Sequence, residues 1–206
     1  MSASSAAPLI GVFALQGDVR EHLRAIESAG CRATAVRRET ELAAVDGIIL
    51  PGGESTAMIK LAKAFDLLEP LRKRIADGLP TYGSCAGMIL LADRLASGGD
   101  PLEDTFGGLD VTVRRNAFGR QVDSFEEDVS VDGIAGDPVH AVFIRAPWVE
   151  EVGPAATALG RIGSGSLAGT IVVVRQRHLL ATSFHPELTG DGRIHGYFCE
   201  MVRTRA

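Results

Sequence analysis

Cysteine is scarce in this sequence, and the number and spacing of the cysteines exclude two common roles. Cys31, Cys85 and Cys199 are odd in number and widely spaced, so they do not form a disulfide framework. No two of them form the CxxC pair that often marks a zinc site. Isolated cysteines of this kind are typical of a reducing compartment, and we expect a cytoplasmic protein.

Long apolar runs and a basic leader are also missing. No hydrophobic stretch approaches the ~20 residues that a membrane helix needs. Residues 1–7 are small or polar and lack the basic residues that open a signal peptide, so we expect a disordered tail there. The formal net charge of −5 argues against a nucleic-acid partner. A small molecule or another protein is the expected partner.

The 206 residues suffice for one α/β domain with its own buried core. In the first half, apolar runs alternate with amphipathic stretches. Strands are expected at 9–15, 32–36, 47–50 and 81–84, and helices at 18–29, 55–65, 67–77 and 86–95. Asp18 is expected to cap the first helix, with Glu21 as its capping-box partner. This alternation predicts a mostly parallel central sheet flanked by helices.

The second half is richer in strands. They are expected at 109–114, 122–131, 139–144, 158–162, 170–176 and 178–184, followed by a closing helix at 191–204. The segment 97–108 is expected to be a surface loop. Because no internal repeat or low-complexity linker divides the chain, residues 8–206 are expected to form a single domain.

One pentapeptide, Gly83–Gly87 (GSCAG), has the pattern of a nucleophile elbow. It places Cys85 between two glycines, where side chains would clash as strand and helix approach each other. At a helix start the dipole favours a thiolate, and the N–H of Ala86 can face an oxyanion. The alternative is that Cys85 is a small core residue. We interpret Cys31 and Cys199 in that way, because neither lies in a glycine turn.

A second pattern, His185–Pro186–Glu187, can supply a base and a carboxylate. Pro186 favours an extended His185, and residues two apart in an extended chain project to the same side. Glu187 is therefore expected to accept a hydrogen bond from one imidazole nitrogen while the other faces the thiol. The alternative is a solvated pair at a strand end. The remaining histidines are expected to be packing or surface residues without a metal: His22, His140, His178 and His195.

The segment 50–56 (LPGGEST) ends the third expected strand at the carboxyl edge of the sheet, where ligands bind. Gly52 and Gly53 let the backbone approach a substrate and donate N–H groups to an oxyanion. A phosphate-binding loop is the competing interpretation, but the GxxxxGK[ST] pattern is absent. A plain turn with Glu54 or Ser55 near the helix cap also remains open.

Together these segments resemble the class I glutamine amidotransferases. The resemblance extends to residues 11–17 (GVFALQG), 115–121 (RNAFGRQ) and 143–147 (FIRAP). Many amidotransferases share the elbow and the His–Pro–Glu run. The GGEST, RNAFGRQ and FIRAP stretches narrow the resemblance to the glutaminase subunits of pyridoxal 5′-phosphate synthases.

The resemblance implies a role for each matching residue. Cys85 would be the nucleophile, His185 the base and Glu187 its orienting carboxylate. The N–H groups of Gly53 and Ala86 would bind the oxyanion. The glutamine would be held by Gly53, Glu54, Ser55, Arg115, Ile144 and Arg145. Guanidinium groups suit the α-carboxylate of glutamine, although the residues alone would favour a solvated strand face for both arginines.

The implied reaction is hydrolysis of L-glutamine to L-glutamate and ammonia, with no cofactor in this chain. Ammonia would pass to a synthase subunit, within a large hetero-oligomer, for synthesis of pyridoxal 5′-phosphate. Neither nucleic acid nor membrane would take part. Three alternatives stay open: a γ-glutamyl hydrolase or cysteine peptidase, an ammonia-supplying subunit of another amidotransferase, and a non-catalytic binding module.

Overall fold

A computed structural model describes residues 7–97, 102, 104–117 and 124–205. Residues 1–6 of the expected tail, parts of the expected loop at 97–108 and the start of the strand expected at 122–131 lie outside the described residues. Among the described residues, no helix combines the length and the apolar character needed to cross a membrane.

Most of the described strands join one ten-stranded sheet, ordered β2-β1-β3-β4-β12-β11-β9-β6-β5, with β10 paired to β11. The pairs from β2 to β12 are parallel, whereas β11 pairs antiparallel with β12, β9 and β10. The strands are β1 Leu9–Phe13, β2 Arg32–Val36, β3 Gly47–Leu50, β4 Thr81–Ser84, β5 Ala92–Leu95, β6 Leu109–Arg114, β9 Trp148–Val152, β10 Thr157–Arg161, β11 Ile171–Gln176 and β12 Leu179–Thr182. A separate antiparallel pair consists of β7 Ser124–Val129 and β8 Val139–Ile144.

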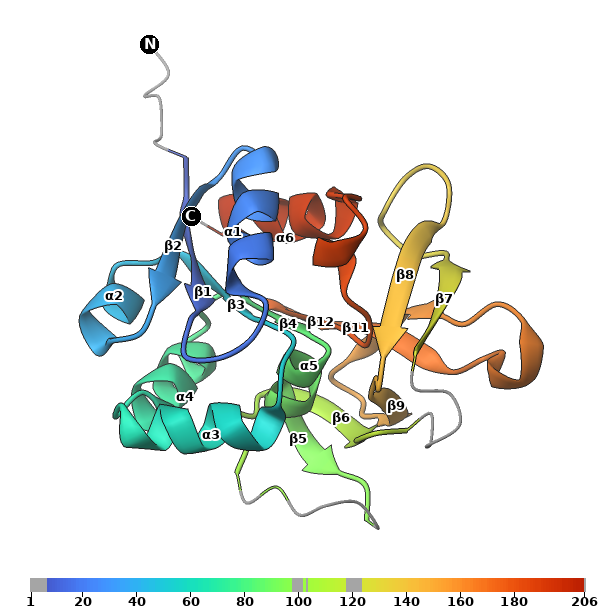
Figure 1. Ribbon diagram of the computed structural model, residues 1–206, viewed down its shortest axis with the longest axis horizontal. Helices are drawn as coiled ribbons and strands as arrows, with labels where there is room; N and C mark the ends of the chain where they lie inside the picture. Colours follow the sequence, from blue (N-terminus) through green and yellow to red (C-terminus); the bar gives the residue numbers. More distant parts are fainter. Residues whose placement is uncertain (1–6, 98–101, 103, 118–123, 206) are drawn as a thin grey trace.

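Helices cover both faces of the parallel strands (Figure 1). They are α1 Val19–Ser28, α2 Glu39–Ala43, α3 Ser55–Ala64, α4 Leu68–Ala76, α5 Ala86–Leu91 and α6 Arg193–Arg203, with short 3-10 helices η1 Gly165–Leu167 and η2 Pro186–Leu188. In Figure 1, α1 and α6 lie on one side of the sheet, and α3, α4 and α5 lie on the other. The predicted α/β fold, with a mostly parallel first half, is confirmed.

Two apolar cores result, one on each face. Along β3, Ile48 and Leu50 belong to the core beneath α3, α4 and α5, whereas Ile49 belongs to the core beneath α1 and α6. All four residues of β3 are buried. A strand covered on both faces has an unbroken apolar sequence, which explains why this segment was identified correctly.

The helix predicted at 86–95 is wrong in its second half. The helix α5 ends at Leu91, and the next four residues form β5, which pairs in parallel with β6. The carboxylate of Asp93 accepts a hydrogen bond from the N–H of Gly108 at 2.6 Å, and the guanidinium of Arg94 donates to Asp110 at 2.8 Å. These distant partners hold the segment as a strand, and a local pattern cannot contain them.

Candidate active site

Cys85 lies in the sharp turn between β4 and α5, with φ 50° and ψ −102°. A Cβ atom on Gly83 would lie 2.5 Å from the carbonyl group of Gly87, and one on Gly87 would lie 2.2 Å from the carbonyl oxygen of Leu50. Neither position has room for a side chain, as the sequence predicted. The turn presents Cys85 at the carboxyl edge of the parallel strands, close to the ends of β3 and β12.

His185 and Glu187 come from the segment that follows β12. Nδ1 of His185 donates to Oε1 of Glu187 at 2.7 Å, and the Glu187 side chain is completely buried. The predicted contact is present, but the reason given for it was wrong. Pro186–Leu188 forms the 3-10 helix η2, so a tight turn, and not the alternation of an extended chain, brings the carboxylate to the ring.

The electrostatics around His185 favour its protonated form. Burial disfavours the imidazolium, but hydrogen bonds with Asp18, Cys85 and Glu187 together raise its pKa to about 12. Sγ of Cys85 lies 4.0 Å from the carbonyl oxygen of Ile144, in a partly buried position. A protonated imidazole beside a thiol favours a thiolate–imidazolium pair, which is the reactive state of a cysteine nucleophile.

Asp18 has a different role from the predicted one. It precedes α1 as the N-cap residue, but its side chain makes no capping hydrogen bond, so the predicted capping box with Glu21 is wrong. Its Oδ2 lies 3.5 Å from Nδ1 of His185, and its N–H donates to the carbonyl oxygen of Gly52 at 3.3 Å. The carboxylate thus has a distant partner that a local capping pattern cannot reveal.

The glycine turn after β3 packs directly against these groups. A Cβ atom on Gly52 would lie 2.2 Å from Cε1 of His185, and one on Gly53 would lie 2.3 Å from Oε1 of Gln16. Because the Gly52 carbonyl points to the N–H of Asp18, the Gly53 N–H on the other side of that trans peptide points away from Asp18. The close approach of Gly52 to His185 explains why this turn needs glycine.

Two of the predicted glutamine-binding residues lie together beside α3. The Glu54 carboxylate accepts hydrogen bonds from the N–H groups of Thr56 and Ala57 at 2.9 and 2.7 Å, and Nη2 of Arg115 lies 3.6 Å from its Oε1. Burial works to raise the pKa of Glu54, but these N–H groups and Arg115 hold it below its ordinary value. Ser55 is buried at the first position of α3.

The other predicted binding residues lie at the end of β8. Ile144 is 40% exposed, and its carbonyl oxygen faces Cys85. Arg145 is exposed, has φ 43°, and makes no hydrogen bond or ion pair with any described residue. The structure therefore brings Ile144 to Cys85, and brings Glu54 to Arg115. Of the two glycines in the turn, Gly52 lies against His185, and Gly53 lies against Gln16. No contact among the described residues links Arg145 to the others.

Two buried histidines behind Glu187 were missed as site residues. Nε2 of His22, in α1, lies 3.6 Å from Oε2 of Glu187, and its Nδ1 lies 2.9 Å from Nε2 of His195 in α6. Ser84 Oγ lies 3.3 Å from the same Glu187 oxygen. The sequence predicted packing roles for both histidines. Its one usable signal was the placement of His22 one turn after Asp18, which puts both on the same face of α1.

Asp18, His185 and Glu187 also form the one group of potential metal ligands among the described residues. Their ligand atoms lie within 4.8 Å of one another. Nδ1 of His185 carries a proton and donates a hydrogen bond to Glu187, so it has no lone pair to offer a metal in this arrangement. The donor set fits a hydrogen-bonded acid–base pair better than a metal site.

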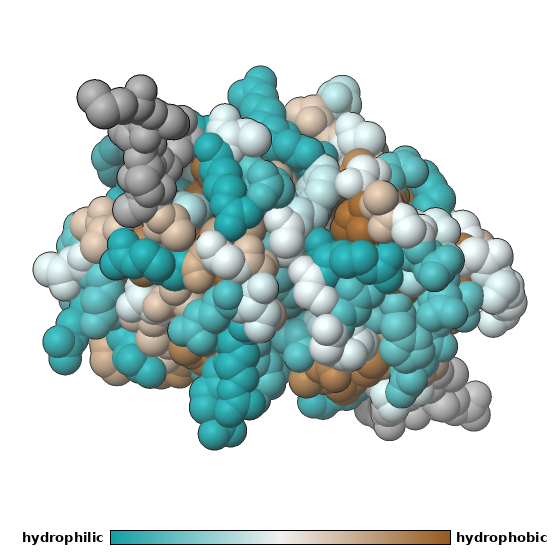
Figure 2. All heavy atoms as spheres, turned by 90° about the horizontal axis from the view of Figure 1, so that it is seen from above, coloured by the Kyte–Doolittle hydropathy of each residue, from teal (hydrophilic) through white to brown (hydrophobic). Residues whose placement is uncertain are grey.

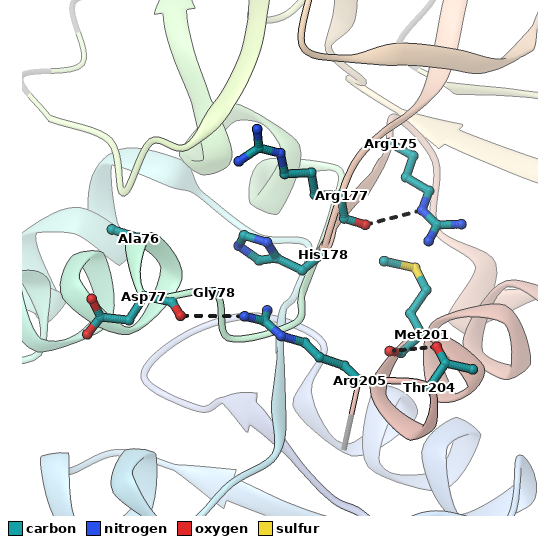
Figure 3. Close-up of a pocket in the computed structure, with 9 residues that line it drawn as sticks. All are labelled: Ala76, Asp77, Gly78, Arg175, Arg177, His178, Met201, Thr204 and Arg205. Carbon is teal, nitrogen blue, oxygen red and sulfur yellow. Dashed lines mark hydrogen bonds between the residues drawn. The ribbon is translucent and has the colours of Figure 1, made fainter.

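A separate hollow of about 480 Å³ lies at the opposite edge of the sheet (Figure 3). Figure 3 shows His178 between the side chains of Arg177 and Arg205. Nε2 of His178 donates to the carbonyl oxygen of Ile75 at 2.9 Å, and Arg205 donates to that of Asp77 at 3.5 Å. These contacts satisfy carbonyl groups at the end of α4. None of the predicted site residues lines this hollow.

Comparisons with known proteins agree with the fold. Residues 12–204 match the model of the SNO glutamine amidotransferase family. The chain is 63% identical to the pyridoxal 5′-phosphate synthase subunit PdxT of Kineococcus radiotolerans, covering 98% of each chain, and 60% identical to that of Acidothermus cellulolyticus, covering 100% of this chain and 99% of the relative. A crystal structure of a glutamine amidotransferase matches with a TM-score of 0.85 and 45% identity, covering 94% of this chain and 98% of that one. The chain therefore belongs to the SNO glutamine amidotransferase family.

Proposed function

We propose that this chain is the glutaminase subunit of a pyridoxal 5′-phosphate synthase. It hydrolyses L-glutamine to L-glutamate and delivers the ammonia to a synthase subunit. The main support is the juxtaposition of Cys85, His185 and Glu187 at one edge of the sheet, in a chain 63% identical to a PdxT subunit.

The proposed reaction begins with the thiolate–imidazolium pair. The sulfur of Cys85 attacks the side-chain amide carbon of glutamine, and the negative charge moves to the carbonyl oxygen. The N–H groups of Ala86 and Gly53 are proposed to bind this oxyanion. The imidazolium of His185 then gives its proton to the departing nitrogen, and ammonia leaves a γ-glutamyl thioester on Cys85.

Hydrolysis of the thioester returns the enzyme to its starting state. Neutral His185 removes a proton from water as the water oxygen attacks the thioester carbon, and the carbon–sulfur bond breaks to release glutamate. Glu187 fixes the orientation of the ring throughout, because its Oε1 accepts a hydrogen bond from Nδ1 at 2.7 Å. Nε2 of His185 is then left to face Cys85 and the substrate.

The α-amino-acid end of glutamine carries one charge of each sign, and the pair of Glu54 and Arg115 offers the complement. Arg115 can hold the α-carboxylate, and Glu54 can accept from the α-ammonium group. Arg115 is only 10% exposed at its side chain, and the N–H groups of α3 already position Glu54. Ser55, Ile144 and Arg145 would complete the binding site.

The surroundings of the site also fit a protein partner. Ile144 and Leu188 are 40% and 47% exposed and belong to β8 and η2, which pack against each other. Figure 2, which views the molecule from above Figure 1, shows apolar residues gathered in patches among hydrophilic ones. A synthase subunit that covers Ile144 and Leu188 would remove apolar surface from water and enclose the site.

The test is release of glutamate from L-glutamine by the purified chain, with and without its synthase subunit. A γ-glutamyl peptide serves as the competing substrate. Hydrolysis of free glutamine that increases with the synthase subunit is the expected result. Hydrolysis of the peptide but not of free glutamine would reject the proposal in favour of a γ-glutamyl hydrolase or peptidase.

A further inference from the structure

We propose that His22 and His195 are positioning residues that extend the Cys85–His185–Glu187 series into the core. In this arrangement His22 directs its Nε2–H at Oε2 of Glu187, 3.6 Å away, and His195 fixes the tautomer of His22. The inference rests on the proposed function, because it concerns the carboxylate that orients His185. It assigns a role to two histidines that make no contact with the substrate site.

Both rings are neutral in the folded protein. His22 and His195 are completely buried. Burial, followed by the nearby His195 and His185, lowers the pKa of His22 well below its ordinary value, and burial lowers the pKa of His195 to about 4. A neutral imidazole carries a single N–H, so each ring donates one hydrogen bond and accepts one.

The geometry selects between the two possible tautomers of His22. If Nδ1 carried the proton, the lone pair of Nε2 would face the Glu187 carboxylate at 3.6 Å, and both groups would be acceptors. If Nε2 carries the proton, it points at the carboxylate, and Nδ1 accepts from Nε2–H of His195 at 2.9 Å. The second arrangement gives Nδ1 of His22 a hydrogen-bond partner and turns its Nε2–H toward the buried carboxylate. At 3.6 Å this second contact is electrostatic and too long for a hydrogen bond, so Nε2 of His22 and Nδ1 of His195 have no hydrogen-bond partner among the described residues.

Other groups around the pair cannot replace this donor. The ring of Tyr82 packs edge-on against His22 and His195, but its hydroxyl pairs with Oγ1 of Thr182 at 2.8 Å. Ser84 has one hydroxyl proton for two acceptors, the carbonyl oxygen of Phe184 at 3.2 Å and Oε2 of Glu187 at 3.3 Å. Oε2 of the buried carboxylate therefore has that shared proton and, at 3.6 Å, the N–H group of His22.

A matched pair of substitutions separates positioning from packing. The amide nitrogen of glutamine is as many bonds from Cα as Nε2 of histidine, whereas that of asparagine corresponds to Nδ1. His22→Gln therefore keeps the donor to Glu187, and His22→Asn removes it. Both variants lose ring volume, so a packing role predicts lower activity in both. The loss of activity would be larger for the shorter asparagine side chain, and a lower melting temperature would accompany it.

The variants are assayed as full chains in complex with the synthase subunit, with thermal melting measured in parallel. We expect His22→Asn to lower kcat roughly 10-fold with little change in KM, because the loss of an N–H group that faces a buried carboxylate disturbs His185. The acid limb of the kcat/KM profile should also move to higher pH. His22→Gln should recover most of kcat and the original acid limb. Equal kcat losses in the two variants, or an unchanged His22→Asn, would overturn the proposal.

A second measurement on the unsubstituted chain does not depend on activity. Imidazole ¹⁵N spectra should show His22 as the Nε2–H tautomer with a bare Nδ1. A His22 ring protonated at Nδ1 would overturn the proposal even if Cys85 and Glu187 act as proposed. Conversely, glutaminase activity that survived removal of Cys85 would reject the proposed function while leaving the tautomer of His22 unchanged.

Discussion

Cys85 differs from the other two cysteines in its neighbours and not in its burial. All three are less than 10% exposed, at 6%, 7% and 0% for Cys31, Cys85 and Cys199. Cys31 and Cys199 belong to the apolar core beneath α1 and α6, where burial and the nearby Cys31 raise the pKa of Cys199 to about 12. Cys85 instead faces His185, which is held protonated. This contrast predicts selective reactivity.

A chloroketone that mimics glutamine should therefore alkylate Cys85 and spare Cys31 and Cys199. Reaction requires both an activated sulfur and a neighbouring site for the amino-acid end of the reagent. Peptide mass mapping after limited labelling measures the extent at each cysteine. Equal labelling of all three would mean that the surroundings of Cys85 do not activate it.

The neutral, buried His195 predicts a loss of stability in acid. Its pKa is lowered from 6.5 to about 4, so between these values the unfolded chain takes up a proton that the folded chain does not. The contribution of His195 to the free energy of unfolding is therefore fully present above pH 6.5 and falls toward pH 4, by on the order of 3 kcal/mol. His22 acts in the same direction.

Denaturant unfolding between pH 7 and pH 4 tests this prediction. His195→Phe, which cannot take up a proton, should reduce the loss of stability on acidification. His140→Gln is the control: Asp128 and Glu126 raise the pKa of this exposed histidine, so its removal should not reduce the loss of stability in acid. An unchanged acid slope in His195→Phe would show that the buried histidine pair does not control stability in this range.

At the scale of elements, the strand–turn–helix elbow depends on close backbone contact. Gly87→Ala would place a Cβ atom 2.2 Å from the Leu50 carbonyl oxygen, so α5 would have to move away from β3. We expect a loss of roughly 1–3 kcal/mol in the free energy of unfolding, together with reduced glutaminase activity, because Cys85 would shift.

Gly196→Ala provides the matched control for this substitution. Gly196 lies inside α6, and a Cβ atom there would have nothing within 4 Å. We expect a gain of roughly 0.5–1 kcal/mol, because alanine restricts the unfolded chain and favours the helix. Denaturant unfolding of both variants gives the comparison. If Gly87→Ala were as stable as Gly196→Ala, the elbow would not be as tightly packed as the contacts indicate.

Sequence patterns located most elements of the parallel half. The strands at 32–36, 47–50 and 81–84 have the predicted bounds. The strand at 47–50 is buried at every position, and a strand covered on both faces is a short, apolar run between turn residues. The patterns failed for three short elements: β5 was predicted as helix, and β9 and α2 were not predicted. Each of these is four or five residues long. Pairing with β6 stabilises β5 and β9, whereas α2 is capped locally by Glu41, which accepts from the N–H groups of Arg37 and Arg38.

The candidate site was predictable in its residue types but not in all of its contacts. The Cys85 turn and the His185–Glu187 pair carry local signals, since glycine and proline restrict the backbone there. Asp18 and His22 carry signals typical of a cap and of a packed helix face. Their contacts with His185 and Glu187 depend on how α1 docks beside η2, which only the folded chain reveals.

At the scale of the whole molecule, we predict that the isolated chain hydrolyses glutamine poorly and that its synthase partner activates it. The proposed oxyanion donor Gly53 shares a peptide with the Gly52 carbonyl, which the Asp18 N–H holds at 3.3 Å. Glycines on both sides allow this peptide to rotate at little steric cost. A partner in contact with α1 or the 16–18 turn could select the active orientation.

A titration of the chain with the purified synthase subunit measures this activation. Glutamate release should rise with synthase concentration and level off when the complex is saturated. A rate that is already maximal without the partner, and flat across the titration, would rule out the switch. It would leave the chemistry proposed for Cys85 untouched.

The central claim, that Cys85 is the nucleophile of a glutaminase, is tested most directly by Cys85→Ser. Glutamate release is measured in the presence of the synthase subunit, with thermal melting and complex formation as controls. The account predicts near-complete loss of activity with an unchanged melting temperature and intact complex, because a hydroxyl is far less ionised than a thiol beside a protonated histidine. Activity retained by the serine variant would contradict it.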